Sequence, residues 1–338
     1  MILVTGATGH LGNVLVRELI NTGENVRVFI RPDEALNSLS GLPVQVSKGD
    51  VLERDTVMKA MQGVTEVFHL AGIIAIRPGM EKVMYQVNVE GTRNVAEAAL
   101  ENNVRRFVHV SSVHAFRREP LGVTIDENTP LALDSPIGSY DRTKAEGTKV
   151  ILDLVKRGLN AVIVCPSGLI GAHDYFDSEM GKTLVSFTAN KLDFLVEGAY
   201  DFVDVRDVVA GMLAARTKGL SGEIYILSGT RVTVEDLHQM AQDTSGRKTA
   251  KIKIPISLAM FAVRLLQTLF QWLKIKSRYT VYSLQTLLDN SVFSSHKART
   301  ELGYTARPLS EAVTDFLHWF EIHRPKVSRK IKKQSSGM

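Results

Sequence analysis

The chain has 338 residues, which is enough for one large domain and a smaller appended region. Its composition, 44% hydrophobic and 23% charged, is ordinary for a packed soluble protein. The single cysteine, Cys165, excludes an intramolecular disulfide and favours a reducing compartment. An apolar strand begins by Ile2 and leaves no room for a signal peptide, so we expect a cytoplasmic protein.

The formal net charge of +5 is concentrated at the C-terminal end. Residues 324–338 include six basic side chains and no acid, so the rest of the chain carries a charge of about −1. This distribution argues against a nucleic-acid partner. We expect 324–338 to be a basic disordered tail, with weak attraction to an anionic membrane surface as the alternative.

Short apolar runs alternate with helical patterns through the first half of the chain. Strands are predicted at 1–5, 25–30, 44–47, 66–70, 105–110 and 161–165. Helices are predicted at 11–21, 55–61, 87–101 and 144–156. This alternation predicts an α/β protein with a Rossmann-type, doubly wound parallel sheet, helices on both faces and right-handed crossovers. Ligands bind at the carboxyl ends of the strands in such a sheet.

The pattern is looser beyond the sixth strand. Residues 172–200 are typical of a loop and a helix, and 223–227 of one more strand. Thr233 is predicted to cap a helix over 234–242, with Asp236 at the third helical position. The remainder is mainly helical.

These patterns predict two regions and a tail. The dinucleotide-binding domain covers 1–170, with a later return of the chain near 201–228. A smaller, mainly helical C-terminal substrate region covers 171–200 and 229–323. The tail covers 324–338.

Residues 256–273 carry apolar side chains at helical spacing, interrupted by polar ones. A membrane-spanning helix needs about 20 largely apolar residues, so no transmembrane segment is predicted. We expect a buried or substrate-covering helix. A helix that lies on a membrane surface is the alternative.

Three spaced glycines, Gly6, Gly9 and Gly12, follow the first strand and open the first helix. Such a turn lets a pyrophosphate approach backbone N–H groups at the helix N-terminus. Arg31 ends the second strand, where an arginine accommodates the 2′-phosphate of NADP and an acid binds the ribose of NAD. The nearest acid, Asp33, follows a proline, so NADP is predicted, with NAD as the alternative.

Tyr140 and Lys144 are four residues apart and share a face if the segment is helical. A tyrosine, with a pKa of about 10, can protonate the oxygen that forms when a hydride adds to a carbonyl. A lysine ammonium nearby favours the phenolate and should lower that pKa. Together with the glycine loop, the pair predicts hydride chemistry on a carbonyl or an alcohol.

The order of these motifs resembles the extended short-chain dehydrogenase/reductase family, which includes NAD-dependent epimerases and dehydratases and dihydroflavonol-reductase-like enzymes. The motifs are TGATGHLG at 5–12, GDV at 49–51, HLAG at 69–72, NVEG at 88–91, VSS at 110–112, YDRTK at 140–144 and FVDVRD at 202–207. The resemblance implies a Rossmann fold, a nicotinamide cofactor and a small-molecule substrate.

The resemblance also implies roles for single residues. Ser112 would hydrogen-bond the substrate oxygen, Tyr140 would be the general acid/base, and Lys144 would also hold the nicotinamide ribose. Asp50 and Val51 would hold the adenine. The full predicted cofactor site comprises Gly6, Thr8, Gly9, His10, Leu11, Gly12, Arg31, Asp50, Val51, Leu70, Ala71, Gly72, Asn88, Ser111, Tyr140, Lys144, Pro166, Gly168 and Leu169.

Two reaction classes use this set of residues. Sugar-nucleotide epimerases usually continue from the serine into a Tyr-Gly pair, whereas this chain has Phe116 and Arg117. With Arg31, this departure favours a reductase, and an NAD-dependent sugar-nucleotide epimerase or dehydratase is the alternative. A catalytically silent, cofactor-sensing protein is disfavoured because Ser112, Tyr140 and Lys144 are all intact.

Other features are less informative. The nine histidines and the single cysteine show no metal-ligand spacing, so no metal is predicted. His114 and His173 are expected to flank the substrate pocket, more as loop residues than as catalysts. The apolar residues of 256–273 suggest a hydrophobic alcohol or ketone, and dimerisation, common in the family, leaves a homodimer open.

Overall fold

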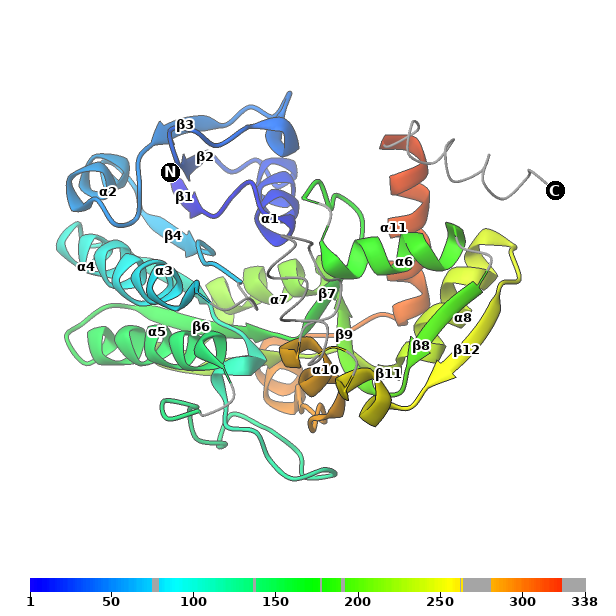
Figure 1. Cartoon of the computed structure of the whole chain (residues 1–338). Helices are drawn as coiled ribbons and strands as arrows, with labels where there is room; N and C mark the ends of the chain where they lie inside the picture. The colour runs from blue at the N-terminus through cyan, green and yellow to red at the C-terminus, as the bar shows by residue number, and fades with distance from the viewer. Residues whose placement is uncertain are drawn as a thin grey trace.

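The computed structural model describes residues 1–74, 79–135, 138–176, 178–189, 192–261, 263 and 281–323. Its centre is a seven-stranded parallel sheet in the order β3-β2-β1-β4-β5-β6-β10 (Figure 1). The strands are β1 (Ile2–Thr5), β2 (Val26–Ile30), β3 (Gln45–Lys48), β4 (Glu66–His69), β5 (Arg106–Val110), β6 (Ala161–Pro166) and β10 (Ile224–Leu227). The strand order reverses between β1 and β4, and such sheets bind ligands at this crevice.

Helices cover both faces of the sheet (Figure 1). One layer contains α1 (His10–Asn21) and α7 (Val205–Lys218). The other contains α2 (Arg54–Met61), α4 (Thr92–Glu101) and α5 (Ser139–Val155), with α3 (Glu81–Tyr85) and a π-helical stretch, Gln86–Gly91, leading into α4. The sheet is therefore buried on both sides, as parallel sheets are.

Neighbouring residues of each central strand enter different cores. In β1, Val4 packs with α1 and α7, whereas Leu3 packs on the opposite face against the other helix layer. In β2, Val28 and Phe29 divide in the same way. Because successive side chains of a strand point to opposite faces, both faces can be apolar only when the strand is a continuous apolar run. This explains the strand pattern in the sequence.

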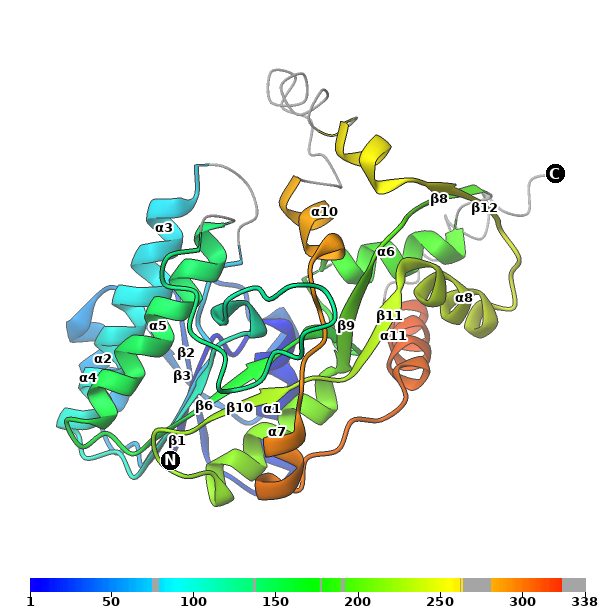
Figure 2. The ribbon, with the colours of Figure 1, turned by 90° about the horizontal axis from the view of Figure 1, so that it is seen from below.

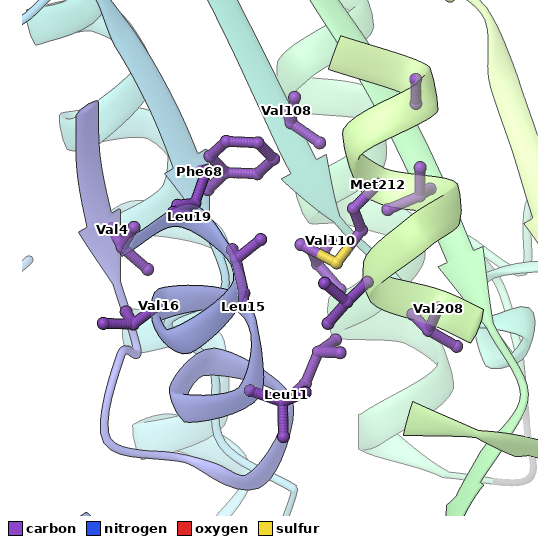
Figure 3. Packing of buried hydrophobic residues seen from close by; sticks show 14 of the residues in the cluster. Val4, Leu11, Leu15, Val16, Leu19, Phe68, Val108, Val110, Val208 and Met212 are labelled. Atoms are coloured by element: carbon purple, nitrogen blue, oxygen red, sulfur yellow. The ribbon is translucent and has the colours of Figure 1, made fainter. Parts of the chain in front are cut away.

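The core between α1 and the sheet shows the helical spacing directly (Figure 3). Leu15 and Leu19 lie one turn apart on α1 and face Phe68 of β4 and Val110 of β5, with Met212 of α7 beside them. Leu15 and Leu19 are completely buried. Burial of a leucine side chain contributes roughly 1.5–3 kcal/mol, so this seam fixes α1, and with it the glycine loop, on the sheet.

The C-terminal region combines helices with two small sheets (Figures 1 and 2). The first sheet contains β7 (Gly168–Ile170), β9 (Ala199–Asp204) and β11 (Thr230–Thr233), and the second pairs β8 (Leu192–Val196) with β12 (Ala250–Ile254) in parallel. The helices are α6 (Glu179–Ala189), α8 (Val234–Ser245), α10 (Val281–Leu288) and α11 (Leu309–His323). A separate apolar core holds α6, α8 and α11 against β9.

The predicted fold class is confirmed, and every predicted strand of the large sheet is present within one residue at each end. The capping box of Thr233 and Asp236 is also present. The loop and helix expected at 172–200 are present, with α6 as the helix, but the expectation missed β8 and the start of β9, which follow α6. The strand partner of β8 is β12, more than fifty residues further along the chain, and no local pattern reveals such a pairing.

Two expectations fall largely outside the described residues. Of the apolar stretch 256–273, the structure describes 256–261 and 263, and 256–261 is helical. The tail 324–338 lies wholly outside. Within the described ranges, no helix is both long and apolar enough to cross a membrane.

Two histidines lie side by side inside the sheet. His69 of β4 pairs in register with His109 of β5, and their rings stack with centroids 5.5 Å apart. His69 contacts Thr5 Oγ1 at 2.8 Å and Thr92 Oγ1 at 3.0 Å, whereas neither nitrogen of His109 has a hydrogen-bond partner in the described structure. Burial, and then the charge of Lys144, lowers the pKa of His69 to about 3. Burial also holds the pKa of His109 well below its ordinary value.

This pair predicts a loss of stability in mild acid. Below a pH of about 6.5 the unfolded chain binds protons at these histidines and the folded chain does not, so stability falls as the pH falls toward the folded-state pKa. The loss approaches about 1.4 kcal/mol per pH unit for each histidine. Between neutral pH and pH 4.5, we expect the free energy of unfolding to fall by about 2 kcal/mol less in His109→Leu than in wild type. Urea unfolding followed by circular dichroism at the two pH values measures this difference.

The control is His318→Gln, because His318 is exposed. This variant should follow the wild-type pH dependence. Identical pH dependence in His109→Leu and wild type would show that His109 takes up its proton in the folded protein.

Candidate active site

The glycine loop combines one strained turn with two close approaches. Gly6 has φ +66°, and a Cβ there would lie 2.7 Å from the backbone of Leu70 and Ala71. A Cβ on Gly12 would lie 2.1 Å from the carbonyl oxygen of Gly6. At Gly9 a Cβ would meet only that same oxygen, at 3.4 Å, so the protein itself does not require glycine there. The space in front of Gly9 is thus open in the described structure.

The N-terminus of α1 lies at this loop. Its N-cap, Gly9, provides no side-chain hydrogen bond to the first turn. The N–H groups of a first turn have no partner within the helix, and they attract anions. The side chains of the neighbouring residues point elsewhere: Leu11 packs in the core, and His10 Nε2 contacts the carbonyl oxygen of Ala172 at 2.9 Å. In the described structure, therefore, no N-cap side chain occupies the N-terminus of α1.

Opposite charges meet after the end of β2. The Arg31 side chain is 60% exposed, and its Nε lies 3.7 Å from Glu34 and 4.0 Å from Asp33. Glu34 also accepts hydrogen bonds from the Arg31 backbone N–H at 3.3 Å and from the Thr8 hydroxyl of the glycine loop. Sequence reasoning considered Asp33 and missed Glu34, which is the acid that reaches the loop.

The residues after β3 form a local wall. Asp50 Oδ1 accepts the backbone N–H of Leu52 at 2.9 Å. Val51 is buried, and its carbonyl oxygen accepts Asn94 Nδ2 at 2.9 Å. A Cβ on Gly91 would lie 2.6 Å from the Val51 side chain, so the close packing of Val51 requires this glycine.

The segment after β4 lies between the glycine loop and α5, and it contacts both. The backbone N–H of Ala71 donates to Thr5 Oγ1 at 3.2 Å. A Cβ on Gly72 would lie 3.3 Å from Asn88 Oδ1 and 3.6 Å from Lys144 Nζ. Three predicted site residues therefore meet at one point: Gly72 after β4, Asn88 of the π-helical stretch and Lys144 of α5. Leu70, the first residue after β4, packs against the core of α1 and α7.

Asn88 holds this junction together. Its amide nitrogen donates to the carbonyl oxygen of Ile73 at 3.0 Å and to Thr143 Oγ1 at 3.1 Å. Its amide oxygen accepts the backbone N–H of Ile73 at 2.7 Å. One buried side chain thus ties the segment after β4 to α5.

The three predicted catalytic residues lie together at the carboxyl end of β5. Ser112 follows this strand, and its Oγ accepts the backbone N–H of His114 at 3.2 Å. Ser112 is also close enough to Tyr140 to act on the pKa of its phenol. Tyr140 and Lys144 lie one turn apart on α5, which begins five residues earlier than predicted. Lys144 Nζ donates to the carbonyl oxygen of Val110 at 3.1 Å. Ser111 is directed differently, because its hydroxyl lies 2.6 Å from Thr148 Oγ1.

Burial dominates the electrostatics of this group. It raises the pKa of Tyr140 to about 12, although the hydrogen bond with Ser112 acts in the opposite direction. It lowers the pKa of Lys144 to about 8. The expectation that Lys144 would lower the pKa of Tyr140 is therefore not met in this structure, because loss of solvent disfavours both charged forms. At neutral pH Tyr140 carries its proton, and it can act as an acid.

The remaining predicted cofactor residues lie at the end of β6 and in β7. Pro166 ends β6, and Gly168 and Leu169 are the first two residues of β7. A Cβ on Gly168 would lie 2.6 Å from the ring of Phe202 in β9, so this glycine is required by strand packing. Leu169 packs against the core of α1 and α7.

A buried carboxylate next to Tyr140 was not predicted. Asp141 is 1% exposed, and it accepts hydrogen bonds from Tyr282 Oη at 2.6 Å and from Arg118 at 2.9 Å. His114 Nδ1 lies 3.2 Å from the same carboxylate. Burial raises the pKa of Asp141, but the hydrogen bond and charge of His114 and the charge of Arg118 outweigh it and hold the pKa below its ordinary value. The carboxylate is thus ionised at neutral pH.

His114 connects this carboxylate to Tyr140. Its ring meets the Tyr140 ring edge-on, with centroids 5.5 Å apart, and its Nε2 lies 2.9 Å from Tyr200 Oη. Tyr282 comes from α10 and Tyr200 from β9, so three distant segments converge on α5. Tyr282 approaches so closely that a Cβ on Gly138 would lie 2.7 Å from its ring. No spacing in the sequence signals this cluster.

His173 lies at a different place from His114. It has φ +66°, and its ring lies near Tyr175 and Trp319. Burial lowers its pKa to about 4. In the parts of the chain that the structure covers, no group of three or more histidine, cysteine or acidic side chains could hold a metal ion.

Three comparisons place these features among known proteins. The sequence model of the NAD dependent epimerase/dehydratase family matches residues 2–228. The chain is 36% identical to sterol demethylase protein B of Methylococcus capsulatus over 94% of this chain and 97% of that protein. It is 30% identical to a 4-hydroxy-2-methyl-3-oxo-4-farnesyl-3,4-dihydroquinoline-1-oxide ketoreductase of Stigmatella aurantiaca, over 93% and 94% of the two chains.

A solved structure has the same fold over nearly the whole chain. The crystal structure of gox2253 superposes with a TM-score of 0.84 at 33% identity, and it covers 96% of this chain and 98% of its own. The family match covers the parallel sheet from β1 to β10 and includes the glycine loop, Ser112, Tyr140 and Lys144. The chain belongs to the NAD-dependent epimerase/dehydratase family, and thus to the extended short-chain dehydrogenases/reductases.

Proposed function

We propose that this protein is an NAD(P)-dependent reductase that interconverts a carbonyl and an alcohol. The observation that carries the proposal is the meeting of Ser112, Tyr140 and Lys144 beside Gly72, at the ligand-binding edge of the sheet. The room in front of Gly9 and the uncapped N-terminus of α1 fit a dinucleotide pyrophosphate. When bound, the nicotinamide supplies the hydride.

The side chains divide the remaining work. Ser112 hydrogen-bonds the carbonyl oxygen and directs it toward Tyr140. Tyr140 donates its phenolic proton to this oxygen as negative charge develops there. Lys144, whose pKa of about 8 leaves it mostly protonated at neutral pH, stabilises the phenolate that remains. The raised pKa of Tyr140 keeps the phenol protonated at neutral pH, which is the form that proton donation to a carbonyl oxygen requires.

The substrate of this reaction is proposed to be an apolar ketone or alcohol. Two relatives carry names that refer to a sterol and to a farnesylated quinoline oxide. Large apolar side chains are exposed in the substrate region, including Leu258 and Phe261. Both observations support a substrate with a hydrophobic body.

The second candidate is an NAD-dependent sugar-nucleotide epimerase or dehydratase. The name of the matching family favours it. Against it, the Tyr-Gly pair of epimerases is replaced by Phe116, which is buried, and Arg117, which pairs with Asp134 at 2.9 Å. A reductase consumes one cofactor per turnover, whereas an epimerase returns the hydride, so net oxidation of NADPH separates the two.

The first test of the function is Tyr140→Phe. This variant keeps the ring but loses the transferable proton, so we expect kcat for NADPH-dependent ketone reduction to fall by a factor of about 10² or more. Cofactor affinity should change little. The assay follows NADPH absorbance over a panel of steroidal, prenylated and aryl ketones.

Tyr85→Phe is the matched control, because Tyr85 is exposed on α3. It should keep wild-type turnover. Equal turnover of Tyr140→Phe and wild type on the same ketone would remove Tyr140 from the acid role.

A pair of glycine variants tests the cofactor loop. Gly9→Val should fold, because a Cβ there meets only one backbone atom at 3.4 Å, but it should lose dinucleotide binding. Gly12→Val should instead lower the Tm strongly, because its Cβ would lie 2.1 Å from the Gly6 carbonyl oxygen. Calorimetric titration with NADPH and thermal melting measure the two effects. Normal NADPH affinity in a folded Gly9→Val protein would contradict the proposed pyrophosphate site.

Cofactor preference is proposed to depend on Arg31. A guanidinium can bind a 2′-phosphate with charge-assisted hydrogen bonds of about 1.5–3 kcal/mol, or roughly ten- to a hundredfold in affinity. We therefore expect tighter binding of NADPH than of NADH, and loss of this preference in Arg31→Ser. Glu34→Gln should strengthen NADPH binding, because Glu34 competes with the phosphate for Arg31.

The test measures the dissociation constants of NADPH and NADH for wild type, Arg31→Ser and Glu34→Gln. Arg27→Ser is the control, because the Arg27 guanidinium donates to the carbonyl oxygens of Ala60 and Gln62, away from the loop. Equal affinities for NADPH and NADH in wild type would contradict the role of Arg31 and favour the NAD-dependent alternative.

A further inference from the structure

His114 contacts both Ser112 and Tyr140. It lies in a 3-10 helical turn, Val113–Ala115, directly after Ser112. Its backbone N–H donates to Ser112 Oγ at 3.2 Å, and its ring meets the Tyr140 ring edge-on with centroids 5.5 Å apart. Edge-to-face packing is a preferred arrangement of aromatic rings. A change in His114 would therefore act on Ser112 and Tyr140 together.

The Nδ1 side of the His114 ring is held by the carboxylate of Asp141, which is 1% exposed. Asp141 Oδ2 accepts hydrogen bonds from Nε and Nη2 of Arg118, at 3.1 Å and 2.9 Å. Asp141 Oδ1 accepts the hydroxyl of Tyr282 at 2.6 Å and lies 3.2 Å from His114 Nδ1. Tyr282 Oη also lies 3.2 Å from Nδ1, but its proton is directed to Asp141. Since neither neighbour can supply a proton to Nδ1, we assign the ring proton to Nδ1 itself.

The other ring nitrogen is held by Tyr200. In a neutral imidazole with its proton on Nδ1, Nε2 is an acceptor. Tyr200 Oη of β9 donates to this nitrogen at 2.9 Å, and the two rings stack with centroids 6.0 Å apart. Rotation of the His114 ring would break hydrogen bonds at both nitrogens, which is costly beside a buried carboxylate. Groups from α5, α10 and β9 thus hold the ring in one orientation.

The proposed reduction requires two hydroxyl groups to reach one carbonyl oxygen. Ser112 Oγ accepts the backbone N–H of His114, so the serine keeps its own proton for this oxygen. Tyr140 must deliver its proton to the same atom. A displacement of about 1 Å can lower the rate of such a reaction by roughly 10²-fold.

We propose that His114 is a positioning residue that keeps the hydroxyl groups of Ser112 and Tyr140 directed at the same carbonyl oxygen. Asp141 and Tyr200 act through it, because they fix its ring. His114 exchanges no proton with the substrate in this role. The inference rests on the proposed function and adds to it the group that aligns its two donors.

The alternative role for this ring is direct contact with the substrate. The His114 side chain is 18% exposed, and it lines a hollow together with Phe116, Tyr200 and Phe293. Both ring nitrogens, however, already have partners in the protein. The two roles differ in their kinetics, because loss of positioning lowers kcat, whereas loss of substrate binding raises KM.

Steady-state reduction of a ketone by the full chain tests the proposal. We expect His114→Ala to lose about tenfold or more in kcat, with the ketone KM and the NADPH dissociation constant unchanged. His114→Asn should recover part of this loss, because its amide nitrogen can replace Nδ1 as a donor to Asp141. Tyr200→Phe should lower kcat by less, because only the partner of Nε2 is lost. His318→Ala is the matched control, since His318 is exposed on α11, and it should keep the wild-type kcat.

Three outcomes would overturn the positioning role. The first is equal kcat in the folded His114 variants and in wild type. The second is a raised ketone KM at unchanged kcat, which would assign His114 to substrate binding. The third is an equal loss of kcat and NADPH affinity, which would assign His114 to the fold alone. Circular dichroism melting shows which variants fold, and His114→Asn and Tyr200→Phe carry the test if His114→Ala does not.

Failure of this inference can be told apart from failure of the proposed function. A wild-type protein that reduces no ketone would overturn both. A wild-type protein that reduces a ketone, with Tyr140→Phe impaired and His114→Ala unimpaired, would overturn the positioning role alone.

Discussion

A parallel sheet that must be buried on both faces is the constraint on which the rest of this structure depends. Because each strand is followed by a crossover that covers one face, all seven strands end at the same edge. The glycine loop after β1, Gly72 after β4 and Ser112 after β5 are brought together for this reason alone. Residues that are more than a hundred positions apart in the chain are thus placed at one edge of the sheet.

The buried carboxylate of Asp141 adds a second organising contact. An ionised group in the interior is tolerated only when it is paired and hydrogen-bonded, and here Arg118, His114 and Tyr282 satisfy it. Of these partners Tyr282 comes from α10, so the carboxylate ties this C-terminal helix to the helix that carries Tyr140 and Lys144. Removal of one partner would leave the buried charge less well compensated.

Site residues could be predicted from the sequence where their interactions are local in the chain, and not where they join distant segments. Gly6, Tyr140 and Lys144 were predicted because their roles require fixed local spacing: a turn between a strand and a helix, and one helical turn. Glu34, which reaches Thr8, was missed because its role depends on the path of the chain after β2. The contact between His114 and Tyr282 joins segments that are far apart in the chain, as does the pairing of β8 with β12. In neither case does the sequence of one segment indicate its partner.

The raised pKa of Tyr140 shows how this packing bears on the chemistry. The packing around Ser112 and Lys144 also excludes water from Tyr140. The free-energy cost of ionising the buried phenol is therefore larger than the stabilisation that nearby groups give to the phenolate. Asp141 adds to this effect, because its negative charge opposes a phenolate on the neighbouring residue. Burial is the main cause, and the carboxylate that anchors α10 adds to it in keeping Tyr140 protonated. In the proposed reaction, the packing of α10 against α5 thus favours Tyr140 as the proton donor.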